Sequence, residues 1–85
     1  MNPNNGDLHN GTSRWNDLTA RELAVASLVG RAMTNQQIAR RLEISSHTVN
    51  FHLRQVFRKL DIRSRVELAL LARALEGTGD PADFA

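Results

Sequence analysis

The chain has 85 residues, no cysteine and a formal net charge of +2. This length allows at most one small domain, and the absence of cysteine excludes disulfides, thiolate zinc sites and thiol nucleophiles. Between Ile38 and Arg65 lie seven Lys and Arg residues and two acidic ones, so this segment carries +5 and the rest of the chain −3, a distribution that favours a polyanionic partner.

Neither end of the chain shows a packing or targeting pattern. Residues 1–16 are rich in Asn, Gly, Ser and Thr, and residues 77–85 (GTGDPADFA) are short and acidic. We therefore expect a disordered N-terminal tail at 1–16, a domain at 17–76 and a flexible C-terminal tail at 77–85. The start lacks the features of a signal peptide, and no apolar run approaches the roughly 20 residues that span a bilayer. The expected protein is cytoplasmic and does not bind membranes.

Capping residues predict two helices in the first half of the domain. In TARE, Thr19 is placed to cap a helix and Glu22 to reach back to the cap, which predicts a helix from about Ala20 to Gly30. TNQQ repeats this arrangement with Thr34 and Gln37, which predicts a short second helix through about residue 42.

A long third helix is predicted at about 46–60, with Ser45 as its cap. Its apolar residues recur with helical spacing and form one stripe, made of Val49, Leu53, Val56, Phe57 and Leu60. The opposite face carries polar and basic residues, with one aromatic ring among them: His47, Asn50, Phe51, Arg54 and Arg58.

A fourth helix is predicted to begin at SRVE, with Ser64 and Glu67, and to end before residue 77. Four helices without a strand pattern predict an all-α fold. Apolar residues cover nearly the whole circumference of this helix, and one face is enough for the core. We expect a homodimer through about residues 65–75, with Val66, Leu70, Leu71 and Ala74 at the interface. The alternative is a monomer with an unusually hydrophobic core helix.

The second helix, a short turn and the third helix form the helix-turn-helix pattern. The similarity goes beyond this general pattern. Residues 17–75 resemble the LuxR-type (FixJ-type) helix-turn-helix domain, through the segments LTARE, TNQQIARRLEIS, TVNFHLRQVFRKLDIRSR and VELAL. The matching positions include Arg21, Glu22, Asn35, Lys59 and Arg65.

This resemblance implies a four-helix DNA-binding domain of bacterial transcription regulators. In that domain the third helix lies in the major groove of double-stranded DNA, and the fourth helix forms a dimer. The resemblance assigns Asn50, Phe51 and Arg54 to base edges. It assigns a second group to phosphates: Thr34, Ser46, Thr48, His52 and Arg58. The helical projection adds His47 to this second group.

Several of these residues have a second interpretation. Phe51 can read a thymine methyl beside an Arg54 that pairs with guanine, or it can be a single exposed apolar residue without function. His52 can contact a phosphate, or pack and hydrogen-bond at the helix junction. Arg40 and Arg41 are interpreted as solvated residues that stabilise the last carbonyls of the second helix.

Three positions depart from the family pattern. Asn50 replaces the usual Lys, which alters sequence preference. Ala32 replaces a common Gly, with Gly30 two positions earlier, and Ala24 replaces an acidic residue; both changes affect local geometry. Family members commonly carry a receiver or ligand-binding domain ahead of this one, whereas only about 17 residues precede the first helix here. The chain is therefore a stand-alone regulator, which the initial Met favours, or a fragment.

The main rival function is a helical protein-interaction module that acts on another regulator or on RNA polymerase without specific DNA binding. Ser45, Ser46 and His47 are adjacent in the sequence, but nothing there activates a nucleophile. His47 and His52 do not share a helix face that could hold zinc. We therefore expect no catalysis, no cofactor and no metal site.

Overall fold

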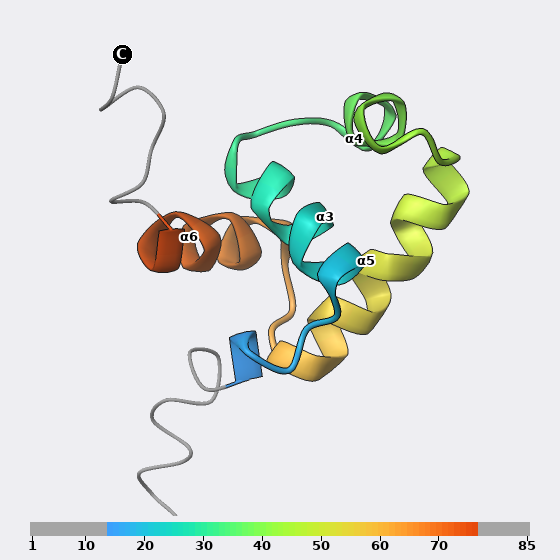
Figure 1. Cartoon of the computed structure of the whole chain (residues 1–85). Coiled ribbons are helices and arrows are strands. Elements are labelled where there is room, and N and C mark those ends of the chain that lie inside the picture. The colour runs from blue at the N-terminus through green and yellow to red at the C-terminus, as the bar shows by residue number, and fades with distance from the viewer. Residues whose placement is uncertain (1–13, 77–85) are drawn as a thin grey trace, which may run out of the picture.

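The computed structural model describes residues 14–76, which form four helices (Figure 1). They are α3 (Ala20–Gly30), α4 (Asn35–Leu42), α5 (Ser46–Leu60) and α6 (Arg65–Glu76), and residues 14–76 contain no strand. The predicted all-α class and the four predicted helices are confirmed. None of these helices has the length and apolar character that would let it cross a membrane.

The tails predicted at 1–16 and 77–85 lie outside the described residues, apart from residues 14–16. Trp15, within the predicted tail, packs against the hydrophobic core, and Arg14 donates from Nη1 to the carbonyl of Lys59 at 3.5 Å. The packed part of the chain therefore begins at least three residues before the predicted boundary at residue 17.

The first two helices begin with the predicted capping boxes. The Thr19 hydroxyl accepts from the Glu22 amide at 3.1 Å, and the Glu22 carboxylate accepts from the Thr19 amide at 2.9 Å. Thr34 and Gln37 make the same two bonds at 3.1 and 2.8 Å. Each box satisfies two of the amides that a helix N-terminus leaves without intrahelical partners.

The other two helices begin with single side-chain caps. The Ser45 hydroxyl accepts from the Thr48 amide at 3.0 Å, and the Ser64 hydroxyl accepts from the Glu67 amide at 3.1 Å. The Glu67 carboxylate accepts from the amide of Arg63 at 2.8 Å. It thus reaches one residue beyond the cap and also holds the preceding turn.

Three helices end with the same backbone motif. A residue with left-handed φ follows α3, α4 and α5, namely Ala32 (65°), Glu43 (59°) and Asp61 (55°). The next amide in each case donates back across the last turn: Met33 to Leu28, Ile44 to Ala39, and Ile62 to Phe57. This is the Schellman arrangement. Each apolar residue that follows the left-handed one packs against the core, so every helix end also anchors the next connection.

The core is aliphatic, as the scarcity of aromatic residues predicts. α3 lies between α5 and α6, and α4 packs chiefly on α5 (Figure 1). The most deeply buried side chains are Val25, Ala26, Val29, Ile38, Val49, Val56, Leu60, Leu68 and Ala72. Four of the five residues of the predicted α5 stripe are buried, and Phe57 is half-buried. This stripe holds α5 in place and leaves its opposite side free.

Gly30 lies where α3 and α6 approach most closely. A Cβ built on Gly30 would stand 2.8 Å from the Cβ of Ala72, closer than two such carbons pack. Gly30 is therefore required by the helix crossing, whereas the left-handed turn two residues later is made by Ala32 at a cost of about 1–2 kcal/mol relative to Gly.

Replacing Ala32 by Gly should therefore stabilise the domain. Relief of the left-handed strain exceeds the extra flexibility that Gly gives the unfolded chain, so we expect the free energy of unfolding to rise by about 0.5–1 kcal/mol. Chemical denaturation followed by circular dichroism measures it. The control, Ala24→Gly within α3, should lower stability by about 0.5–1 kcal/mol. An unchanged or lower stability for Ala32→Gly would contradict this account.

Candidate nucleic-acid interface

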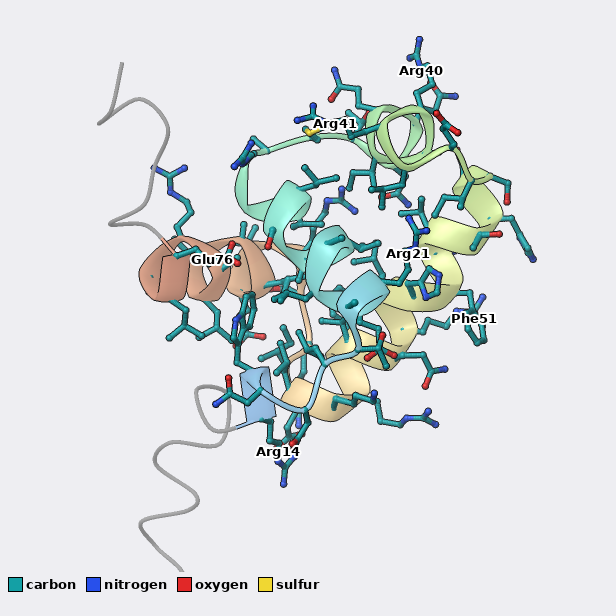
Figure 2. The ribbon with its side chains drawn as sticks, viewed as in Figure 1. Arg14, Arg21, Arg40, Arg41, Phe51 and Glu76 are labelled. Atoms are coloured by element: carbon teal, nitrogen blue, oxygen red, sulfur yellow. The ribbon has the colours of Figure 1, made fainter. Side chains whose placement is uncertain are left out.

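The outward face of α5 is exposed and free of contacts with the core. Phe51 is 54% exposed, and Figure 2 shows its ring pointing away from the molecule. The four polar residues predicted for this face are also exposed: His47, Asn50, Arg54 and Arg58. Because the core already holds the opposite stripe, none of these five side chains is needed for packing.

The face is cationic, and α5 contains no acidic residue. Arg58 donates from Nη2 to the side-chain oxygen of Gln55 on the same helix, which holds its guanidinium to one side. Arg54 is exposed. Two guanidinium groups therefore lie along a helix that is narrow enough to enter a DNA groove.

His52 lies at the border between this face and the core. It is half-buried, and its ring meets the Phe51 ring edge-on, with centroids 5.6 Å apart and planes at 68°. The contact limits the freedom of Phe51. A half-buried position at this border agrees both with a phosphate contact and with packing at the helix junction.

The other residues predicted to contact phosphates divide into two groups. Ser46 and Thr48 lie in the first turn of α5, where the Thr48 hydroxyl is 2.9 Å from that of Ser45. Thr34 caps α4 and lines an open hollow with Met33, Arg65 and Val66. No hydrogen bond within residues 14–76 joins Thr34 to α5. Ser46, Thr48 and His52 thus belong to α5, whereas Thr34 lies at the start of α4, beside the first residues of α6.

An ion pair that sequence reasoning missed fixes α5 against α3. The Lys59 ammonium lies 2.7 Å from the Glu22 carboxylate, and Glu22 is only 6% exposed. The same ammonium donates to the carbonyl of Asp17 at 3.4 Å. Both residues match the LuxR-type pattern, but a separation of 37 positions gives no local signal that they pair.

The environment of Glu22 keeps its carboxyl ionised. Burial raises the pKa of Glu22, but the hydrogen bond and charge of Lys59 and the amide and hydroxyl of Thr19 lower it by more, so the pKa lies below its usual value. Without these partners, burial alone would raise the pKa of this carboxyl.

A second contact that was not predicted joins the starts of α4 and α6. Arg65 donates from Nη1 to the Asn35 side-chain oxygen at 2.7 Å and from Nη2 to the Met33 carbonyl at 2.8 Å. The guanidinium therefore ties the connection after α3 to the first residue of α6.

The residues predicted for a dimer interface do not all lie on one surface. Val66 and Leu70 are 67% and 64% exposed, and Ala74 is also exposed. Their spacing of four residues places these three on one side of α6. Leu71 is half-buried and packs against the core of its own domain, so at least part of this side chain is used within the monomer.

The family described as bacterial regulatory proteins of the luxR family matches residues 16–72 of the chain. The nitrate/nitrite response regulator NarL of Escherichia coli K12 is 40% identical over 55 residues, which is 65% of this chain and 26% of NarL. The nitrate/nitrite response regulator NarP of the same strain is 46% identical over 54 residues, which is 64% of this chain and 25% of NarP.

The transcriptional regulatory protein ComA of Bacillus subtilis is 37% identical over 57 residues, which is 67% of this chain and 27% of ComA. The chain thus spans about a quarter of the length of these relatives. No solved structure matches it at a significant level.

Removing the charge of Glu22 should destabilise the domain in a pH-dependent way. At pH 7, Glu22→Gln should lower the free energy of unfolding by about 2 kcal/mol, because Lys59 loses its charged partner. A pKa that is lower in the folded than in the unfolded protein stabilises fully above the unfolded value, about 4.3, and this stabilisation is lost as the pH falls through the folded value.

Denaturation of both proteins between pH 7 and pH 3 tests this expectation. The difference between the native protein and Glu22→Gln should shrink as the pH falls below about 5. The control is Glu43→Gln, at an exposed acid without an ion-pair partner within residues 14–76, and it should show neither effect. A difference that stayed constant with pH would mean that the carboxylate charge does not stabilise the fold.

Proposed function

The chain belongs to the luxR family of bacterial regulatory proteins, and from this membership we propose that it is a sequence-specific, DNA-binding transcription regulator. The observation that carries the proposal is the outward face of α5, where Phe51 and two arginines are exposed on a helix held in place by its opposite stripe. A helix presented in this way can enter the major groove without disturbing the core.

The proposed base-reading residues are Asn50, Phe51 and Arg54. A guanidinium can pair with O6 and N7 of guanine, and a side-chain amide can pair with N6 and N7 of adenine. Phe51 supplies the apolar contact that distinguishes thymine by its methyl group, and the edge-on contact with His52 limits the motion of the ring. The three residues together would read a mixed sequence, with a pyrimidine methyl beside a purine.

The residues proposed to set the register on DNA surround this face. Ser46, His47 and Thr48 lie in the first turn of α5, where the positive end of the helix dipole attracts phosphate. His52 and Arg58 lie further along the helix, and Thr34 contributes from the cap of α4. Such contacts supply affinity and orientation rather than sequence information.

We propose that two copies of the chain pair through α6. Val66, Leu70 and Ala74 form the exposed apolar side of this helix, with Leu71 at its edge. Its burial against a second copy would remove apolar surface that monomeric proteins rarely leave exposed. A two-fold axis through α6 would place two copies of α5 about 34 Å apart, one turn of DNA.

Selection of binding sites from a random duplex library tests the proposed function. We expect a two-fold-symmetric sequence that binds at least about a hundredfold more tightly than scrambled DNA, with an affinity that falls as salt rises. Phe51→Ala should lower the binding free energy by about 1 kcal/mol on a site that contains thymine at the contacted position. The loss should be smaller on scrambled DNA. Replacement of that thymine by uracil, which lacks the methyl, should reproduce the loss.

The result can also exclude the proposal. Equal, weak binding to every duplex would mean that the face of α5 acts only through its charge. Salt-insensitive binding to a protein without DNA affinity would instead favour an interaction module that acts on another regulator or on RNA polymerase.

A charge on the exposed side of α6 should separate dimerisation from base reading. Leu70→Glu should bind a duplex with one half-site as tightly as the native protein does. Its affinity for a duplex with two half-sites should fall at least about tenfold, because two carboxylates would meet at the interface. The control, Leu75→Glu, introduces the same charge on the same helix, on the side opposite Val66. Equal losses for both variants, or none for Leu70→Glu, would exclude this surface as the interface.

A further inference from the structure

Arg21 occupies a position that the helix dipole disfavours. It lies in the first turn of α3, where the exposed amides give the helix a positive end and acidic residues are preferred. Arg31 at the other end of α3, and Arg40 and Arg41 in the last turn of α4, lie where the dipole favours a cation. The position of Arg21 therefore has no such explanation from the stability of its own helix.

Four of the nine other arginines within residues 14–76 donate hydrogen bonds from their side chains, and Arg21 does not. Arg14, Arg65 and Arg73 donate to backbone carbonyls, and Arg58 donates to a side chain of its own helix. Within residues 14–76, Arg21 makes no ion pair or side-chain hydrogen bond, and it is exposed. Its guanidinium is available to a ligand.

The helical geometry of α3 directs Arg21 away from α6. Gly30, which meets Ala72 of α6, is nine residues further on, and at about 100° per residue this is the opposite side of the helix. Figure 2 shows Arg21 between the ribbons of α3 and α5, on the side of the molecule where Phe51 stands.

The first turn of α3 faces a defined flank of α5. Lys59, which binds Glu22, shares this flank with Thr48, His52 and Gln55, because their spacings of eleven, seven and four residues return to nearly the same direction. All four residues are half-buried. The first turn of α3, which includes Arg21, therefore meets the same flank of α5 that carries Thr48 and His52, both proposed above to contact phosphates.

We propose that Arg21 binds a DNA phosphate and extends this row across the junction from α5 to α3. The inference rests on the proposed function and adds a second helix to the DNA-binding surface. The guanidinium can fork onto two oxygens of one phosphate. The capping box of Thr19 and the ion pair of Glu22 fix the adjacent backbone, so the contact also fixes how far α5 can turn within the groove.

The salt dependence of DNA binding tests the role of Arg21. Arg21→Ala should bind the selected duplex about 5- to 10-fold more weakly per protomer near 0.1 M salt and reduce the slope of log K against log salt by about 0.9 per protomer. It should lose as much on scrambled DNA, since a phosphate contact carries no sequence information. Arg21→Lys should retain most of the slope, because an ammonium also binds phosphate.

Two controls keep the outcomes distinct. Arg31→Ala removes the same charge from the other end of α3 and should leave the slope unchanged. Thermal denaturation should show Arg21→Ala to be at least as stable as the native domain, because Ala removes the unfavourable charge from the first turn. An unchanged slope for Arg21→Ala, with a native protein that binds its selected site, would overturn this inference alone. A native protein that binds no duplex would overturn the proposed function and this inference with it.

Discussion

The carboxylate of Glu22 performs two tasks in this domain. It closes the capping box of α3 and, through the same oxygen, binds the ammonium of Lys59 near the end of α5. The packed aliphatic stripe holds α5 against the core. The charged hydrogen bond of 2.7 Å to the buried Glu22 adds a directional contact near the end of the helix. The outward face of α5 therefore has a defined direction before any ligand arrives.

The connections support the same rigidity without glycine. Ala32, Glu43 and Asp61 adopt left-handed backbone conformations that Gly usually provides. Each is followed by an apolar residue that packs on the core, and the burial of that residue compensates for the backbone strain. Short turns anchored in this way keep the helix starts in register with one another. In a domain of this size, long and flexible connections would cost a larger share of a small net stability.

The sequence predicted the helix starts better than the contacts between helices. Capping signals are local, because Thr19 and Glu22, or Thr34 and Gln37, are three positions apart. The outward face of α5 was also predictable, since one apolar stripe fixes the opposite side. The pairs Glu22–Lys59 and Asn35–Arg65 join residues 37 and 30 positions apart, and no periodicity reports such a pairing. The sequence also grouped Leu71 with the residues of the dimer interface, because α6 is apolar almost all round. Only the packed structure distinguishes the side of α6 that faces the core from the side that is exposed. The boundary at residue 17 missed Trp15 because a single aromatic residue in a polar segment has no periodicity.

The arrangement of α5 has a consequence for how its sequence can change. The proposed base-reading residues Asn50, Phe51 and Arg54 lie on the exposed face of α5, so a substitution there costs little stability. Thr48, His52 and Lys59 lie on the flank that faces α3, where a substitution disturbs the packing of two helices. Under the proposed function, changes in sequence preference are therefore expected to concentrate on the exposed face, where Asn50 stands. The flank must instead change together with the first turn of α3, because Glu22 and the proposed phosphate ligand Arg21 are adjacent there. Under the proposed function, a domain built in this way would acquire a new target sequence while the geometry of its approach to DNA stays constant.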